Sequence, residues 1–242
     1  MDLRSIGQGA LTIHCKENPL NSAEMTSAKE EAWELLSGNP WLQKKTGRGR
    51  RLKELREYVD TYLPEMKERP LQGFLDIGPG PGELIELAMA ESMDGYGWDA
   101  ESPEGGMGND YLRYSRLMHT TRGLDVTYCN DFRPISTRFR NALSIINLRG
   151  SIEQVMSPYM VGEPHHVHQD CRKLAWDETL GEGALISFFR VMRESLTDNG
   201  ILMIAANGAM NVDWYDDAVR RLSGECFLSM ETFNARTHKF YV

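Results

Sequence analysis

The amino-acid sequence predicts an α/β fold: a doubly wound, mainly parallel seven-stranded sheet with an antiparallel C-terminal hairpin, plus an N-terminal helical extension. From residue 73 onward, short apolar runs of strand length alternate with segments of helical periodicity, which implies crossover connections between parallel strands. Before that point the apolar residues recur at helical spacing. We therefore expect residues 1–70 to form a helical extension or lid and residues 71–242 to form one domain.

The N-terminal segment is expected to contain two helices. Ser27 and Glu30 have the spacing of a capping box, and an apolar stretch of good helix formers follows them. Gly38 and Pro40 end that helix. A second helix is predicted over residues 52–62, because its leucines, tyrosines and valine fall on one face at helical spacing.

The remainder of the chain supplies the predicted sheet. The expected strands cover residues 73–77, 96–98, 124–129, 142–148, 201–206, 225–233 and 238–242. The expected helices cover residues 83–90, 109–119, 184–196 and 214–222. Residues 197–200 are predicted to be a turn, since Asn and Gly tolerate left-handed backbone. The last two strands are close in sequence, which suggests an antiparallel hairpin at one edge.

Charge and composition restrict the partners. The formal net charge of −8 disfavours nucleic acid, because like charges repel. Basic residues nevertheless gather between Lys44 and Arg56. This segment is read either as a solvated helix face or as a patch for phosphate or an acidic substrate. Nucleic acid therefore stays an alternative partner that the composition does not favour.

The sequence has no feature that predicts a membrane or an oxidising compartment. No apolar run approaches the roughly 18 residues needed to span a bilayer. The beginning of the sequence lacks the pattern of a secretory signal. The four cysteines lie far apart and form no CxxC pair, which fits a reducing compartment. We expect a cytoplasmic protein without a membrane partner.

The strongest motif is a glycine-rich turn between a predicted strand and a predicted helix. Gly78, Gly80 and Gly82 follow the acidic residue Asp76 in this segment. Glycine allows a sharp turn and close approach of a ligand, and the helix that follows offers free N–H groups. A carboxylate this close to a pyrophosphate is unfavourable, whereas a cationic nucleotide-like ligand would be attracted. The GxGxG spacing also differs from the GxGxxG of NAD proteins, which disfavours an alternative as a nicotinamide or flavin oxidoreductase.

With these residues the chain resembles the class I S-adenosylmethionine (SAM)-dependent methyltransferases, over roughly residues 70–242. The resemblance implies a SAM-binding domain in which Asp76 and the three glycines hold the cofactor, and S-adenosylhomocysteine as product. It implies a ribose contact at Asp99, with Ala100 beside it, and an adenine contact at Asp131 and Phe132. It also places Asn147 at the cofactor. Arg149 is a candidate catalytic residue in the loop after the fourth strand, which faces the methyl group.

The methyl acceptor is less well indicated. The amino-group motif of the family, Asp or Asn followed by Pro-Pro and an aromatic residue, is absent. Three histidines, His165, His166 and His168, lie close together in a predicted loop. His166 and His168 are candidate general bases, which slightly favours O-methylation. The alternatives are a metal site that includes Glu163 and Asp170, which we do not adopt, and a polar surface loop.

Other assignments stay open. We expect an enzyme acting on a small-molecule or other polar acceptor, with Trp33, Trp41 and Tyr62 as candidate acceptor contacts. An alternative is a catalytically silent methyltransferase fold that serves as a binding or scaffold module. A third is a relative of the RNA ribose methyltransferases. Lys53 could match the first lysine of their catalytic set, but Asn147 and Lys239 stand where that set has acidic residues.

Overall fold

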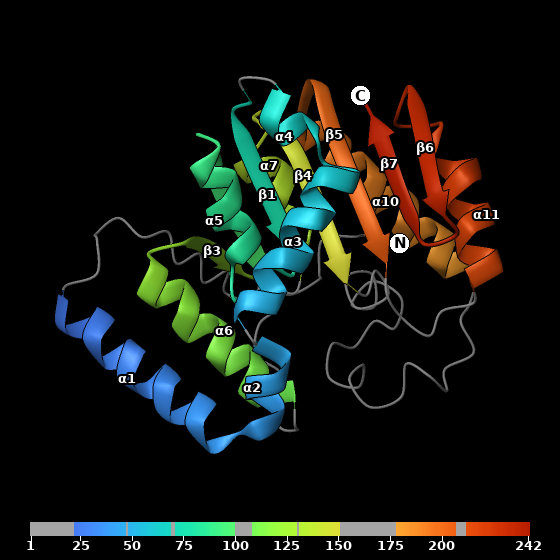
Figure 1. Cartoon of the computed structure of the whole chain (residues 1–242). Helices are drawn as coiled ribbons and strands as arrows, with labels where there is room; N and C mark the ends of the chain where they lie inside the picture. Colours follow the sequence, from blue (N-terminus) through green and yellow to red (C-terminus); the bar gives the residue numbers. More distant parts are fainter. Residues whose placement is uncertain are drawn as a thin grey trace, which may run out of the picture.

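The computed structural model describes residues 22–46, 48–68, 71–99, 108–129, 131–150, 178–206 and 212–242. Its strands form one seven-stranded sheet of order β3-β2-β1-β4-β5-β7-β6 (Figure 1). The strands are β1 (Gly73–Ile77), β2 (Asp94–Asp99), β3 (Asp125–Tyr128), β4 (Leu143–Gly150), β5 (Leu196–Ala206), β6 (Ser229–Asn234) and β7 (Thr237–Tyr241). The first five strands pair in parallel, and β7 is antiparallel to both β5 and β6. The predicted fold class and the C-terminal hairpin are confirmed.

Helices lie on both faces of this sheet, and the first two pack outside one of these layers. The helices are α1 (Ser22–Gly38), α2 (Pro40–Thr46), α3 (Arg48–Tyr62), α4 (Glu65–Glu68), α5 (Glu83–Ala90), α6 (Gly108–Arg122), α7 (Pro134–Arg138), α10 (Glu178–Ser195) and α11 (Val212–Ser223). The strand order runs outward from β1 to β3 and then returns to β4, so it reverses between β1 and β4. In open α/β sheets, ligands bind beyond the carboxyl ends of the strands at such a reversal.

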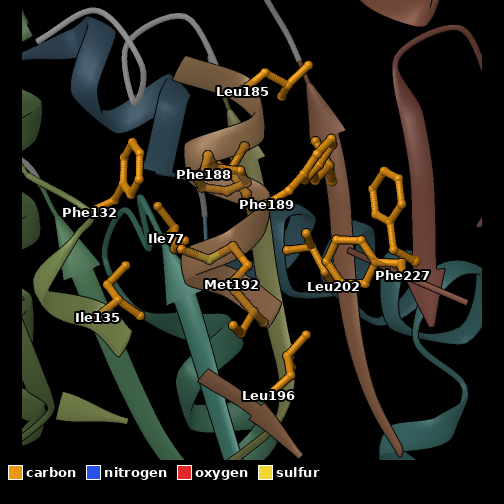
Figure 2. Packing of buried hydrophobic residues seen from close by; sticks show 14 of the residues in the cluster. Ile77, Phe132, Ile135, Leu185, Phe188, Phe189, Met192, Leu196, Leu202 and Phe227 are labelled. Carbon is orange, nitrogen blue, oxygen red and sulfur yellow. The ribbon is translucent and has the colours of Figure 1, made fainter. Parts of the chain in front are cut away.

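One face of the sheet is covered by α7, α10 and α11. Figure 2 shows Phe188, Phe189 and Met192 of α10 packed over Ile77 of β1 and Leu202 of β5. All five side chains are at most 5% exposed. Successive strand residues point to opposite faces, so alternate positions of each strand supply this core. Burial of this apolar surface from water is the main force that holds α10 on the sheet.

The opposite face is covered by α3, α4 and α5. Leu55 and Val59 of α3, with Leu63 directly after it, share a buried cluster with Phe74 of β1 and Met203 of β5. The predicted helix over residues 52–62 is confirmed, although α3 begins earlier, at Arg48. The domain boundary proposed at residue 70 stays a prediction. Helix α3, which precedes this position, packs directly on the sheet. Residues of α3 therefore lie close to the strands β1 and β4.

The first two helices pack outward of α6. Ala32 of α1 and Leu42 of α2 form a small buried cluster with Tyr114 of α6. The side-chain amide of Asn39 donates a hydrogen bond of 2.8 Å to Asp110, near the start of α6. Helix α1 is therefore attached to the sheet through α6.

The first part of β5 differs from the predicted turn. Residues 197–200 lie within β5, but the register with β4 passes from Leu196 directly to Ile201, so the intervening residues bulge out of the ladder. A Cβ atom on Gly200 would lie 2.7 Å from the Leu196 Cβ atom, which shows how tightly the backbone doubles back. The short helices α2, α4 and α7 were not predicted, because helical periodicity cannot be recognised over so few residues. No helix in the described parts of the chain is long and apolar enough to cross a membrane.

Candidate cofactor site

The glycine-rich turn joins β1 to α5, as the sequence predicts. Gly78, Gly80 and Gly82 have φ angles of 70°, 56° and 91°, in the left-handed region that favours glycine. The Gly78 N–H donates a hydrogen bond of 2.8 Å to the carbonyl oxygen of Trp98 in β2. This bond ties the turn to the carboxyl end of β2. The turn therefore lies at the edge of the sheet where a nucleotide-like ligand is expected.

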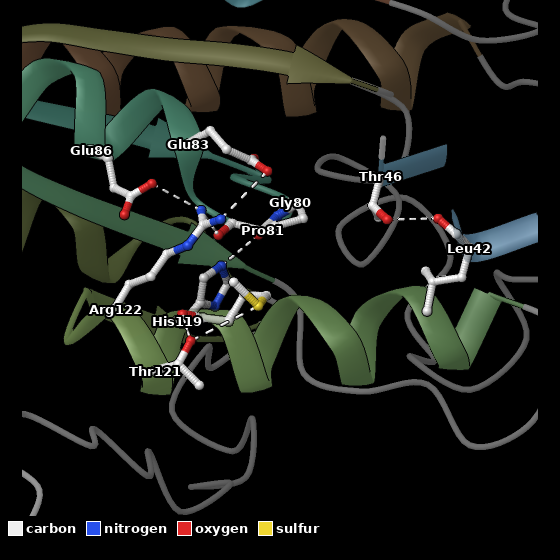
Figure 3. Close-up of polar contacts among 10 residues, drawn as sticks. Leu42, Thr46, Gly80, Pro81, Glu83, Glu86, His119, Thr121 and Arg122 are labelled. Carbon is white, nitrogen blue, oxygen red and sulfur yellow. Dashed lines mark hydrogen bonds and ion pairs between the residues drawn. The ribbon is translucent and has the colours of Figure 1, made fainter. Parts of the chain in front are cut away.

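Two side chains of α6 hold the outer side of this turn (Figure 3). Nε2 of His119 bonds to the carbonyl oxygen of Gly80, and Nη1 of Arg122 donates to the carbonyl oxygen of Pro81 at 2.9 Å. Since a carbonyl oxygen only accepts hydrogen bonds, Nε2 must carry the proton. His119 is 2% exposed. Both carbonyl groups are thus satisfied from the α6 side, which fixes the orientation of the turn.

The His119 ring is in turn held by Tyr128 at the end of β3. Its Nδ1 atom lies 2.8 Å from the Tyr128 hydroxyl. Burial raises the pKa of Tyr128 well above its usual value, and the nearby charge of Asp99 raises it further, although Arg116 opposes this. Tyr128 therefore stays protonated at any physiological pH. Asp99, the predicted ribose-binding acid, is the register partner of Tyr128 in the neighbouring strand. It therefore lies next to the tyrosine that holds His119.

A buried carboxylate lies at the foot of the glycine turn. Asp76 is 2% exposed, and its Oδ1 accepts a hydrogen bond of 2.7 Å from Nδ2 of Asn147 on β4. Asn147 is fully buried, and its Oδ1 accepts a hydrogen bond of 2.7 Å from the hydroxyl of Tyr58 on α3. The structure therefore brings together two residues that the sequence assigned to the cofactor. It adds Tyr58, which the sequence placed only on the apolar face of a helix.

Arg149 lies two residues after Asn147, within β4 and not in the loop after it, so that part of the prediction is wrong. The guanidinium carbon is 5.5 Å from the centroid of the Tyr58 ring, within the range of a cation–π contact. Burial raises the pKa of Tyr58 well above its usual value, and the charge of Asp76 raises it further, while Arg149 partly offsets the rise. The phenol is therefore a hydrogen-bond donor throughout the physiological range. Arg149 provides a cation at the carboxyl end of the strand next to β1.

The predicted adenine contacts follow β3. Phe132 is 2% exposed and packs edge-on against Phe188 of α10, with ring centroids 5.4 Å apart. Its ring belongs to the core, so a contact with a ligand would have to come from its backbone. The Asp131 carboxylate accepts hydrogen bonds from the backbone N–H and the guanidinium of Arg133. The adenine assignment of both residues stays a prediction.

Several predicted site residues lie outside the described residues. They are Ala100 and the histidine segment with its neighbours, Glu163, His165, His166, His168 and Asp170. Within the described ranges there is no group of three or more His, Cys, Asp or Glu side chains placed to hold a metal ion. The histidine roles therefore stay predictions.

Lys53 and Lys239, the two lysines compared with the RNA ribose methyltransferases, both form ion pairs. Lys53 forms an exposed ion pair with Glu57, at 3.7 Å, on the surface of α3. Lys239 of β7 is 3% exposed, and its Nζ lies 3.1 Å from Glu65 of α4. The register across the sheet pairs Lys239 with Met203, which in turn pairs with Asn147. The lysine therefore holds α4 on the same face that carries Asp76.

The candidate acceptor contacts from the N-terminal helices are dispersed. Trp33 and Trp41 are 70% and 52% exposed, on α1 and α2. Tyr62 packs between Tyr58 and Phe233, with ring centroids 5.1 Å and 4.9 Å away. Of the three, only Tyr62 lies next to a residue of the candidate site, and it contacts Tyr58 through its ring.

The strand order, with β7 antiparallel between β5 and β6, agrees with the predicted mainly parallel sheet and its C-terminal hairpin. No family model and no curated protein matches the sequence. A SAM-dependent methyltransferase from Archaeoglobus fulgidus is 12% identical over 79% of this chain and 75% of that chain, with a TM-score of 0.46. Spermidine synthase from Thermotoga maritima is 13% identical over 78% of this chain, with a TM-score of 0.44, and the match spans 58% of its length. A phosphoethanolamine N-methyltransferase from Haemonchus contortus, solved with S-adenosylhomocysteine, is 13% identical over 66% of this chain and 34% of that chain, with a TM-score of 0.39. Similarities this low carry no conclusion about activity.

Proposed function

We propose that this protein binds SAM and transfers its methyl group to a small-molecule or other polar acceptor. The observation that supports this most directly is the buried Asp76 carboxylate at the foot of a left-handed glycine turn. It lies at the carboxyl edge of the sheet, where the strand order reverses. A ligand that enters this turn must accommodate a negative charge fixed two residues before Gly78.

The chemistry of the turn favours a cationic ligand over a dinucleotide. A pyrophosphate would meet the Asp76 charge in surroundings where water screens it little, and the repulsion would be unfavourable. SAM has no phosphate, and it carries a positive sulfonium and an ammonium group. Asn147 is a neutral partner of Asp76, so it leaves the negative charge in place. The residues present therefore fit the cationic ligand that the sequence resemblance implies.

The methyl acceptor must meet the reactive carbon of SAM. SAM supplies an electrophilic methyl group: a lone pair of the acceptor forms the new bond to carbon while the carbon–sulfur bond breaks and its electron pair stays on sulfur. The protein must align the acceptor with that bond, and much of the rate enhancement comes from such alignment. An alcohol acceptor also loses a proton, and we assign its removal to His166 or His168. Arg149 is proposed to orient the acceptor beside Tyr58.

The test is calorimetric titration of the purified protein with SAM and with S-adenosylhomocysteine. We expect both to bind, and Asp99→Ala to weaken binding by at least about tenfold through the loss of the ribose contact. Asp94→Ala is the matched control, because Asp94 is exposed at the opposite end of the same strand. Asp76→Asn should weaken the binding of SAM more than the binding of S-adenosylhomocysteine, because SAM has two positive groups and S-adenosylhomocysteine has one.

Two outcomes would contradict the proposal. If Asp99→Ala and Asp94→Ala bound SAM and S-adenosylhomocysteine with equal affinity, Asp99 would not be the ribose contact of this site. Binding of neither ligand by the wild-type protein would favour the silent scaffold alternative, and the search would turn to a protein or RNA partner.

A further inference from the structure

Helix α3 contributes a hydrogen bond to the candidate site through Tyr58. Leu55 and Val59 of the same helix lie in the apolar cluster against the sheet. Tyr58 lies between them in sequence, and its ring packs against Tyr62 of the same helix. Its hydroxyl passes beyond this apolar layer and meets Asn147 at 2.7 Å. A phenylalanine would fill the same space without this hydrogen bond, so the hydroxyl is what links α3 to Asn147.

The direction of the hydrogen bonds from Tyr58 to Asp76 is fixed by chemistry. The Asp76 carboxylate only accepts, so the Asn147 side chain must present its NH₂ group to Asp76 and its carbonyl oxygen to Tyr58. The Tyr58 hydroxyl must then donate. Each donation polarises the next group, which strengthens the hydrogen bond that reaches the carboxylate. The three side chains therefore have one consistent arrangement.

The arrangement depends on the hydroxyl at its outer end. Without it, the carbonyl oxygen of the fully buried Asn147 loses the donor that the structure provides. An unsatisfied buried acceptor is unfavourable, so the amide gains a reason to rotate in search of another donor. Rotation would turn the NH₂ group away from Asp76, and the carboxylate would lose its 2.7 Å hydrogen bond from Asn147.

We propose that Tyr58 is a positioning residue of the cofactor site, whose hydroxyl, acting through Asn147, orients the Asp76 carboxylate toward the cationic part of the cofactor. This inference rests on the proposed function, because it assigns the ligand of Asp76. It extends the site from the β1–α5 turn to α3, which comes before the glycine turn in the chain. Tyr58 does not touch the reacting atoms in this assignment. It acts through the amide of Asn147.

The test compares Tyr58→Phe with the wild-type protein in titrations with S-adenosylhomocysteine. The substitution removes the hydroxyl and keeps the ring against Tyr62 and Arg149. We expect the Kd to rise about tenfold, the effect of one hydrogen bond to a charged network. Tyr241→Phe is the matched control, because it removes a tyrosine hydroxyl whose partner is Glu231 on β6, and its Kd should stay within about twofold of the wild type. Thermal unfolding with and without ligand checks that both variants fold, and the ligand-induced increase in Tm should shrink in Tyr58→Phe alone.

A double-mutant cycle separates positioning from general packing. Asn147→Leu keeps a similar volume and removes both hydrogen bonds. We expect Tyr58→Phe to have no further effect on the Kd in the Asn147→Leu background, because the hydroxyl acts only through Asn147. Additive effects of the two substitutions would overturn the inference, as would an unchanged Kd in Tyr58→Phe. Both results leave the proposed function intact, whereas a wild-type protein that binds neither ligand overturns both.

Discussion

Two glycines of the cofactor turn share a left-handed backbone but have different surroundings, so alanine substitutions at them should have different effects. Apart from its neighbours in the chain, a Cβ atom at Gly78 would meet no atom of the described residues within 4 Å. A Cβ atom at Gly82 would lie 2.3 Å from Cδ1 of Leu124 and 3.3 Å from Cδ2 of His119. Gly78 is exposed and Gly82 is buried. The first substitution should therefore affect ligand binding, and the second should affect folding.

The magnitudes follow from these contacts. A left-handed backbone costs alanine about 1–2 kcal/mol relative to glycine, and both variants carry this cost. Gly82→Ala must also displace Leu124, which is 4% exposed and packed against Ile85 and Val126. Overpacking of that kind costs about 1–3 kcal/mol more. We expect Gly82→Ala to lose about 2–5 kcal/mol of unfolding free energy and Gly78→Ala about 1–2 kcal/mol.

Urea unfolding and calorimetric titration with S-adenosylhomocysteine test both expectations on the same preparations. Gly78→Ala should remain folded but bind the ligand at least about tenfold more weakly, because its new methyl group occupies the space of the ligand. Wild-type affinity in Gly78→Ala would show that the ligand does not approach the turn there. Equal stabilities of the two variants would refute the packing argument for Gly82.

Two further perturbations probe the rest of the fold. Lys239→Met should lower the unfolding free energy by about 3 kcal/mol, because Glu65 then loses its buried partner. The double variant Lys239→Met/Glu65→Leu should recover most of that loss in urea unfolding, and equal instability of the single and double variants would contradict a paired charge. His238 is fully buried, and burial lowers its pKa below 6.5 although Asp216 opposes the shift. Below pH 6.5 the unfolded state therefore binds more protons than the folded state, so stability should be lost as the pH falls from 6.5 toward the folded-state pKa. His238→Gln should flatten that decline in Tm, and identical pH profiles of variant and wild type would show that another group is responsible.

The sequence predicted the centre of the fold closely. The observed bounds of β1 and α5 agree with the prediction to the residue, because a short apolar run, a glycine turn and a helical apolar stripe follow one another. Gly78, Gly80 and Gly82 were recognisable for the same reason, since three left-handed positions in a short turn favour glycine. These features depend on residues close in sequence.

The contacts that support the site depend on residues far apart in sequence. Tyr58 and Asn147 are 89 positions apart, and periodicity correctly placed Tyr58 on an inward face without showing that its hydroxyl would meet a polar group. His119 is separated from Gly80 by 39 positions. The i, i+3 spacing of His119 and Arg122 was visible in the sequence, but it has meaning only once α6 is known to lie against the turn.

Phe132 illustrates the opposite difficulty. Its place after β3 suggested a ligand contact, yet an aromatic side chain in that position can turn toward either layer. The structure places its ring against Phe188, in the core formed by α10. A position in a motif thus indicated where the backbone passes, while packing decided where the ring lies.

Cleavage of the chain near residue 70 would divide pairs of residues that α3 and α4 form with the sheet. Asn147 and Lys239 lie on one side of that position, and their partners Tyr58 and Glu65 lie on the other. A fragment of residues 71–242 alone would present an apolar sheet face to water, with a lysine deprived of its counter-ion. Such surfaces aggregate. We therefore expect the two pieces to behave as complementary fragments that stay associated after cleavage and are soluble only together.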